Sequence, residues 1–111
     1  EDSKIVIVVP NELKRETSAK KLEREFVSLV NSGFTNIIVD LKNIAEIDQP
    51  CVNAFLSGFK MCYENKGSLK LCNVSHSVNK TLSYVFLNNI LPVFDSTEEA
   101  VNSTKPQVTS K

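Results

Sequence analysis

The residues with the clearest potential for chemistry form one short stretch, 47–52 (IDQPCV). The stretch follows an apolar run at 37–41 and precedes apolar residues with helical spacing, so we place it where a strand ends and a helix begins. The first N–H groups of a helix have no partner within the helix and favour an anion or a partner's carboxylate. Asp48 could cap this helix or contact a partner, and one carboxylate can do both. A hydroxyl here would allow a phosphorylation switch, but residues 47–52 contain no Ser or Thr.

Three other residues near such junctions have a structural and a chemical interpretation. Pro50 suits the first turn of a helix, where its missing N–H costs nothing. A helix N-terminus could lower the thiol pKa of Cys51 and make it a redox sensor, but we favour a small buried residue. His76 is the only histidine and has no acidic or cysteine residue beside it in sequence, so we favour a cap or loop position over catalysis or metal binding.

Composition narrows the class of protein. The 111 residues suffice for one domain with a single core, and 41% of them are hydrophobic. The 13 basic and 13 acidic residues cancel, so no net field attracts nucleic acid or an anionic membrane. No apolar run approaches the roughly 20 residues of a membrane-spanning helix. The three cysteines are odd in number and lack C-x-x-C spacing, which favours a reducing cytoplasm over a disulfide framework or a zinc site.

Strand and helix patterns alternate along the chain. Five of the six residues 4–9 are β-branched, and the run stops at Pro10. Gly33 marks the end of a first helix that begins near residue 17. Residues 96–99 (STEE) have the form of a capping box. We therefore predict strands at 4–9, 36–41, 68–74 and 90–94, with Pro92 marking an edge, and helices at about 17–32, 50–65, 78–86 and from 96.

This alternation predicts an α/β domain with a mostly parallel sheet of about four strands and about four helices. Binding sites in such folds gather where strands end, which selects 48–51 and, as a possible neighbour, 73–76. We expect the domain to cover 1–103, with a mobile polar tail at 104–111. The predicted buried residues are Ala19, Leu22, Phe26, Leu29 and Val30 in the first helix, Val52, Phe55, Leu56, Phe59 and Tyr63 in the second, Val78, Leu82, Val85 and Phe86 in the third, and Leu41, Cys62, Leu71 and Cys72 elsewhere.

Several short features occur in a distinctive order along the chain: residues 37–41, Ile44, 47–48, 67–71, Val78, Leu82 and 99–100. This order resembles the STAS domain, the fold of bacterial anti-sigma-factor antagonists and of the cytoplasmic tails of sulfate-type anion transporters. Residues 11–13 (NEL) resemble the Gly-Glu-Leu that commonly follows the family's early strand. The similarity runs from about residue 4 to residue 101.

The resemblance also shows where this chain departs from the family. Phosphorylatable antagonists read Asp-Ser-Ser-Gly-Leu at the junction, and the second serine takes phosphate from a partner kinase. Here those positions are Asp48, Gln49, Pro50, Cys51 and Val52, so the acceptor position holds Pro50. Family members usually carry another strand before residues 4–9, so we expect either a truncated chain or a reduced variant; the start at Glu1 rather than Met also indicates a fragment boundary.

The resemblance implies a protein-interaction module that binds a GHKL-type kinase acting as an anti-sigma factor, or a related regulator. The alternative is a STAS-like subunit of a lipid or anion transport system, docked on a transporter domain. In either case we expect contact with a protein, not with nucleic acid, and no insertion into a membrane. The sequence lacks a Gly-rich phosphate loop, a GxSxG elbow and metal-ligand spacing, so we expect no catalysis, cofactor or metal. The predicted partner-binding residues are Asp48, Gln49, Pro50, Cys51 and Asn53.

Overall fold

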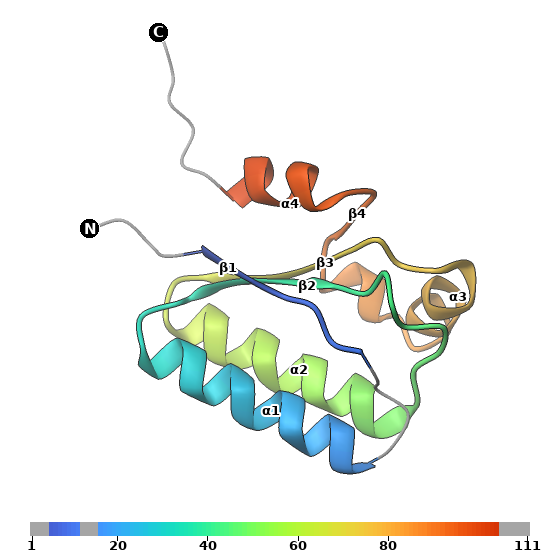
Figure 1. Cartoon of the computed structure of the whole chain (residues 1–111), viewed down its shortest axis with the longest axis horizontal. Helices are drawn as coiled ribbons and strands as arrows, with labels where there is room; N and C mark the ends of the chain where they lie inside the picture. Colours follow the sequence, from blue (N-terminus) through green and yellow to red (C-terminus); the bar gives the residue numbers. More distant parts are fainter. Residues whose placement is uncertain (1–4, 12–15, 105–111) are drawn as a thin grey trace, which may run out of the picture.

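Strands and helices alternate along the chain, as the sequence pattern predicts. The structure is a computed structural model that describes residues 5–11 and 16–104 (Figure 1). Within these residues there are four strands, four α-helices and one short 3-10 helix. In chain order they are β1 (Ile5–Val8), α1 (Glu16–Asn31), β2 (Asn36–Asp40), α2 (Gln49–Glu64), β3 (Ser68–Cys72), α3 (His76–Tyr84), η1 (Leu87–Asn89), β4 (Val93–Phe94) and α4 (Thr97–Thr104).

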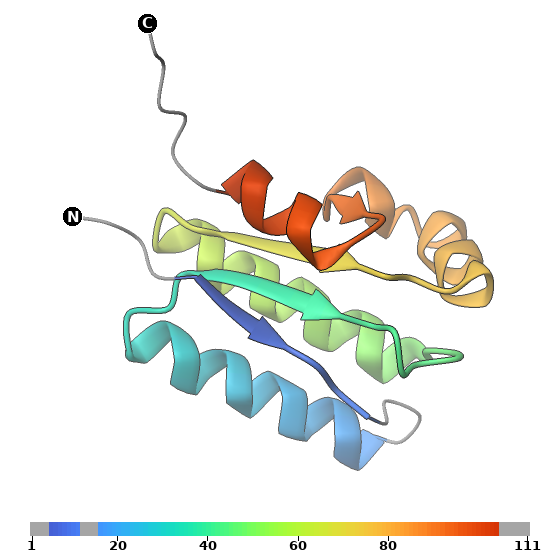
Figure 2. The ribbon, with the colours of Figure 1, turned by 45° about the horizontal axis from the view of Figure 1, so that its top comes forward.

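The four strands form one parallel sheet in the order β1-β2-β3-β4. In its register Ile38 of β2 pairs with Ile7 of β1 and with Lys70 of β3. Helices α1 and α2 cover one face, α4 covers the other, and α3 lies near the carboxyl ends of the strands (Figures 1 and 2). Because β2 has helices on both sides, its residues are all buried, and the three residues between Asn36 and Asp40 are apolar. The predicted α/β architecture is confirmed.

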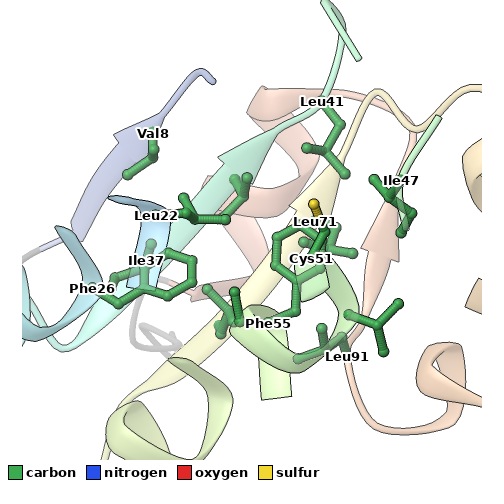
Figure 3. Close-up of a cluster of buried hydrophobic side chains, with 14 of the residues drawn as sticks. Val8, Leu22, Phe26, Ile37, Leu41, Ile47, Cys51, Phe55, Leu71 and Leu91 are labelled. Carbon is green, nitrogen blue, oxygen red and sulfur yellow. The ribbon is translucent and has the colours of Figure 1, made fainter. Parts of the chain in front are cut away.

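The main core lies between the sheet and helices α1 and α2 (Figure 3). Phe26 of α1 and Phe55 of α2 are fully buried there against Ile37 and Leu71 of the sheet. The predicted inner stripe of α1 is confirmed, with Leu29 only partly buried. A smaller cluster under α4 joins Ile38, Cys72 and Ala100, with Ile5, Phe94 and Val101 at its margin.

The predicted inner face of α2 is partly wrong. Tyr63 is 70% exposed and Leu56 is also exposed, while Phe59 is partly buried and stacks on Tyr63 with ring centroids 5.9 Å apart. Several inward positions instead carry small residues, and at one of them, Gly58, an added Cβ would overlap the Phe26 ring of α1. The buried residues of α2 are Cys51, Val52, Ala54, Phe55, Gly58 and Cys62.

The predicted burial of Val85 and Phe86 is also wrong. Helix α3 ends at Tyr84, and Phe86 then takes a left-handed backbone with φ 61° that turns its side chain out of the core. The 3-10 turn that follows places Leu87 and Leu91 in the core instead. Strand β4 is shorter than predicted, because only two residues after Pro92 pair with β3; its position at a sheet edge is confirmed.

The ends of several elements follow the expected cap chemistry. Gly33 has the positive φ (96°) predicted for the end of α1. At the end of α2, Lys66 has a positive φ (64°), whereas Gly67 does not. The capping box predicted at α4 is present in a modified form. Ser96 Oγ accepts from the Glu99 N–H at 3.1 Å, but the Glu99 carboxylate accepts from the N–H of Asp95, one residue before the N-cap. Helix α4 continues to Thr104, the first residue of the predicted tail. Residues 105–111 and the predicted strand start at Lys4 lie outside the described residues, as do Glu12 and Leu13 of the NEL motif.

Candidate functional site

The junction singled out in the sequence lies where β2 has ended and α2 begins. Three apolar side chains, Leu41, Ile44 and Ile47, are buried along the connection and hold it against the core. Asp48 follows in an extended conformation and is the N-cap of α2. Its Oδ1 accepts a hydrogen bond from the Cys51 N–H at 3.3 Å, and its carbonyl accepts from the Val52 N–H at 3.1 Å. The capping interpretation of Asp48 is confirmed, and its side chain remains partly exposed.

The residues after Asp48 alternate between the surface and the core. Gln49 and Asn53 are exposed one helical turn apart, and Gln49 Nε2 donates to Asn53 Oδ1 at 3.2 Å. Pro50 is half-buried in the first turn, as predicted. Cys51 is completely buried, so it offers no side chain to a partner. Four of the five residues predicted to bind a partner therefore share an accessible surface: Asp48, Gln49, Pro50 and Asn53.

The Cys51 thiol stays protonated at neutral pH. Burial raises the pKa of Cys51 to about 12, and the hydrogen bond to the Asp48 side chain acts in the same direction. The helix N-terminus should favour a thiolate, but here desolvation outweighs it. A small buried residue is thus the correct interpretation of Cys51. Burial also raises the pKa values of Cys62, to about 11, and of Cys72.

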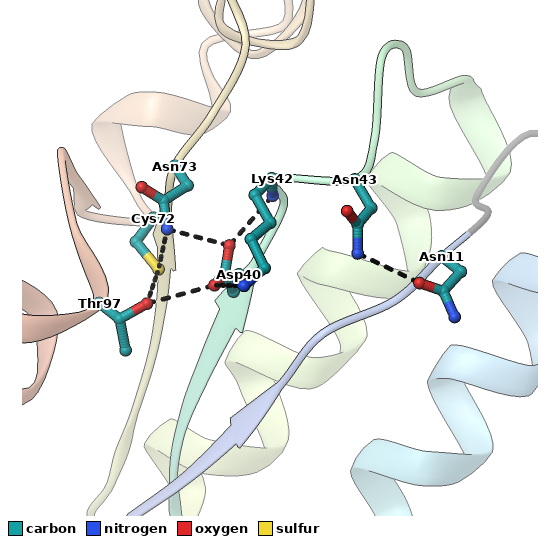
Figure 4. Close-up of polar contacts among 7 residues, drawn as sticks. All are labelled: Asn11, Asp40, Lys42, Asn43, Cys72, Asn73 and Thr97. Atoms are coloured by element: carbon teal, nitrogen blue, oxygen red, sulfur yellow. Dashed lines mark hydrogen bonds and ion pairs between the residues drawn. The ribbon is translucent and has the colours of Figure 1, made fainter.

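Two neighbouring segments support the junction. Ser75 caps α3 by accepting from the Val78 N–H, and its hydroxyl donates to the Ala45 carbonyl at 3.2 Å. The 73–76 junction is therefore a neighbour of the candidate site, as predicted. On the other side, Asn43 Nδ2 donates to Asn11 Oδ1 at 3.1 Å (Figure 4). Hydrogen bonds to neighbouring segments therefore hold the connection between β2 and α2 on both of its sides.

The structure also contains a polar cluster that the sequence reasoning missed. Asp40, at the end of β2, is buried and accepts hydrogen bonds from the Lys42 N–H, from Asn73 Nδ2 at 3.0 Å and from Thr97 Oγ1 at 3.2 Å (Figure 4). Lys42 Nζ adds an ion pair at 4.0 Å, and Cys72 Sγ lies 3.5 Å from the Thr97 hydroxyl. The one available signal was a carboxylate within the otherwise apolar run at 37–41. The cluster joins β2, β3 and α4, which is a structural role.

The exposed groups at the junction can form hydrogen bonds with another molecule. Its surface carries a carboxylate and two amides, which donate and accept hydrogen bonds. In the described part of the chain, no three His, Cys, Asp or Glu side chains gather as metal ligands. Among the same residues, no helix has the length and apolar character needed to cross a membrane.

The fold is a small α/β domain in which the start of α2 is exposed at the carboxyl ends of the strands. Residues 2–100 match the family model of the STAS domain, and the chain belongs to that family. This confirms the resemblance seen in the sequence.

Among the similar proteins, a relative and a solved structure are each described as a putative anti-sigma factor antagonist. A Thermotoga maritima protein described as a "putative anti-sigma factor antagonist" is 24% identical over 91% of this chain and 90% of its own length. A crystal structure with the same description and organism has a TM-score of 0.86 at 22% identity, covering 92% of this chain and 88% of that one. The Bacillus cell fate determinant SpoIIAA in its phosphorylated form has a TM-score of 0.72 at 15% identity, with 94% of both chains covered.

Proposed function

We propose that this STAS domain is a non-catalytic protein-interaction module that acts like an anti-sigma-factor antagonist. It binds a kinase-like anti-sigma factor of GHKL type, or a related regulator, and the binding surface is the start of α2. The observation that carries the proposal is Pro50 in the first turn of α2, at the position that corresponds to the phosphorylated serine of the antagonists it resembles. The chain has a strand-to-helix junction like that of those antagonists, but it has no hydroxyl at the position that would accept phosphate.

The described geometry favours recognition at this edge. The Asp48 cap and the Gln49–Asn53 hydrogen bond hold the first turn in one arrangement. A partner therefore loses little binding free energy to ordering of these side chains. The exposed amides provide hydrogen-bond donors and acceptors, and the partly exposed Asp48 provides a negative charge.

Binding through this surface would not be switched by phosphate at the junction. A phosphoryl group would add about −1.5 to −2 charges beside Asp48 and disfavour docking. Asp48, Gln49, Pro50 and Cys51 have no hydroxyl to receive it, and Ser57 lies farther along α2 and is partly buried. We therefore expect constitutive binding, controlled at the partner or by competition with a phosphorylatable paralogue.

The test begins with capture of the partner from native lysate by the tagged domain. The dissociation constant is then measured for the parent, Asp48→Ala and Gln49→Arg. Gln49→Arg should weaken binding at least about tenfold, because it replaces the amide pair with a bulky charge at the centre of the surface. The matched control is Asn65→Arg, which introduces the same side chain at the other end of α2. Loss of the cap in Asp48→Ala costs about 0.5–2 kcal/mol of stability, so each variant is checked for folding first.

Several outcomes separate the alternatives. A GHKL-type kinase in the eluate supports the proposal, whereas a transporter ATPase or permease supports the transport alternative. Unchanged affinity in folded Asp48→Ala and Gln49→Arg would show that the start of α2 is not the interface. Incubation with the captured kinase and ATP should leave the intact mass unchanged; phosphate mapped within 48–51 would refute the absence of a switch.

A further inference from the structure

Asp40 contacts both of the connections that lie at the proposed binding surface. It is the last residue of β2, and the β2–α2 connection begins directly after it. Its Oδ1 accepts a hydrogen bond from the Lys42 N–H inside that connection at 3.0 Å. The same oxygen accepts from Nδ2 of Asn73, the first residue after β3, also at 3.0 Å (Figure 4). One carboxylate oxygen therefore joins the β2–α2 connection to the β3–α3 connection.

The other carboxylate oxygen of Asp40 contacts α4. Oδ2 accepts a hydrogen bond from the Thr97 hydroxyl at 3.2 Å, and Lys42 Nζ lies 4.0 Å away (Figure 4). The Lys42 side chain is 59% exposed, so its ion pair is weak, and Thr97 is the closer partner. Only 5% of the Asp40 side chain is exposed. Because a buried carboxylate is unfavourable without donors, the arrangement of Asp40 depends on Thr97.

Helix α4 can leave this position more easily than the helices on the other face of the sheet. Ala100 is its one buried residue, and it packs on a small cluster with Ile38 and Cys72. The opposite face is covered by α1 and α2, which have 16 residues each and contribute to the main core. Local opening of α4 therefore exposes little apolar area and costs less free energy than opening of α1 or α2. Such opening withdraws Thr97 and lets water reach Asp40 Oδ2.

Two further hydrogen bonds extend from Asn73 toward the start of α2. Asn73 has a left-handed backbone (φ 55°), and its N–H donates to the Phe94 carbonyl at 3.2 Å. Two residues later, Ser75 Oγ donates to the Ala45 carbonyl at 3.2 Å, within the connection that ends at Asp48. A shift of the Asp40 carboxylate thus acts on the β2–α2 connection directly through Lys42 and indirectly through Asn73.

We propose that Asp40 couples α4 to the proposed binding surface, so that opening of α4 lowers the affinity for the partner. This inference rests on the proposed function and concerns the regulation of the same site. With α4 closed, Thr97, Lys42 and Asn73 share one carboxylate, which holds both connections in one arrangement. With α4 open, the carboxylate turns toward water, and both connections gain freedom that the partner must remove when it binds. Asp40 and Thr97 are positioning residues, because they act through the connections rather than by contact with the partner.

The first experiment needs no partner. Thr97→Val removes the hydroxyl, and Thr97→Ser, the matched control, keeps one at the same position. Amide hydrogen exchange is measured for residues 42–48 and 73–78 in the folded proteins. Exchange there should be at least about threefold faster in Thr97→Val than in the parent, and Thr97→Ser should exchange like the parent. Faster exchange confined to α4 would overturn the coupling, because Thr97 would then hold only its own helix.

The second experiment measures the dissociation constant of the captured partner. Thr97→Val should raise it about three- to tenfold, and Thr97→Ser should restore most of the parent affinity. By linkage, the bound partner should slow exchange of the α4 amides in the parent. If Gln49→Arg weakens binding while Thr97→Val leaves the affinity unchanged, the proposed function stands and the coupling is wrong. If Gln49→Arg binds like the parent, the proposed function fails, and the exchange of residues 42–48 in Thr97→Val supports or overturns the coupling independently.

Discussion

Cys51 shows how two physical effects compete at a single residue. Its place in the first turn of α2 favours a thiolate, because the free N–H groups there stabilise negative charge. Its complete burial has the opposite effect, and burial is stronger, since the pKa rises to about 12. The sequence could identify the conflict but not its outcome, because the outcome depends on the residues that cover the thiol.

The raised thiol pKa values predict that the protein loses stability at alkaline pH. Between the ordinary pKa of 9.0 and the folded values of about 12 for Cys51 and about 11 for Cys62, the folded chain keeps protons that the unfolded chain releases. The stabilisation is therefore complete below pH 9 and is lost as the pH rises through the folded values. Each thiol should lower the free energy of unfolding by about 1.4 kcal/mol per pH unit in that window.

Urea unfolding at a series of pH values from 8 to about 11 measures this effect. The Cys51→Ala/Cys62→Ala variant should lose less stability over this range than the parent. Lysines and tyrosines are common to both proteins, so their titration cancels in the comparison. Equal pH dependence in the two proteins would mean that these thiols are not desolvated as described.

At the scale of the elements, α4 is held mainly by polar contacts at its two ends. Its apolar contact is small and centres on Ala100. At the first turn, the Thr97 hydroxyl donates to the buried Asp40. At the last turn, Lys70 Nζ donates to Ser103 Oγ at 3.0 Å and to Thr104 Oγ1 at 2.7 Å. The anionic contact lies at the N-terminus and the cationic one at the C-terminus, which matches the helix dipole.

Removal of either contact should loosen α4 without unfolding the sheet. Thr97→Val keeps the shape of the side chain and loses the donor, at a cost of about 0.5–1.5 kcal/mol. Hydrogen exchange of α4 amides should become faster while β2 amides keep their protection. The control is Thr81→Val, because the Thr81 hydroxyl bonds only within α3, to the Ser77 carbonyl. If exchange in α4 is equally fast in both variants, the contact with Asp40 does not hold this helix.

The sequence predicted the existence and order of the elements better than their inner faces. Strand 36–40 was predictable from a short continuous apolar run, and α1 was predictable because its apolar residues recur with helical spacing over 16 residues. The inner face of α2 was not, because its closest contact with α1 uses small residues that a search for large apolar side chains overlooks. The exposed Phe86 was missed because its left-handed backbone depends on where Leu87 and Leu91 find space.

The candidate site, like the fold, was predictable only in part. Its place at the start of α2 followed from topology, and the Asp48 cap followed from local chemistry. The Asp40 cluster could not be predicted, because it joins residues 33 and 57 positions apart in the chain. Such pairings depend on the register of the strands and on the position of α4, which local patterns do not determine.

At the scale of the whole molecule, the two ends of the sheet have different roles. The carboxyl ends of the strands carry the exposed polar start of α2 and the Ser75–Ala45 contact. The opposite end is closed by tight turns, where Ser68 N–H donates to the Thr35 carbonyl and Ser68 Oγ donates to Asn36 Oδ1. Substitutions at this closed end should therefore affect stability and leave the proposed partner surface intact.

A substitution at Gly67 tests whether the closed end of the sheet affects stability without affecting binding at the start of α2. Its φ is not positive, so any residue could adopt its backbone, but an added Cβ would overlap the Thr35 carbonyl oxygen. Gly67→Ala must therefore separate the two turns and should cost more than about 2 kcal/mol. Gly33→Ala is the matched control: its φ of 96° is unfavourable for Ala, yet nothing lies within 4 Å of the added Cβ, so its cost should be about 1 kcal/mol.

Urea unfolding gives the two free energies, and titration of the captured partner with folded protein gives the affinities. Gly67→Ala should be the less stable of the two variants, and both should bind the partner like the parent when the folded fraction is counted. This result is expected because the turns at 33–36 and 66–68 lie at the end of the sheet away from the start of α2. A stability loss no larger than that of Gly33→Ala would show that the close contact between Gly67 and Thr35 relaxes freely. A weakened affinity in fully folded Gly67→Ala would show instead that the closed end of the sheet and the start of α2 are coupled.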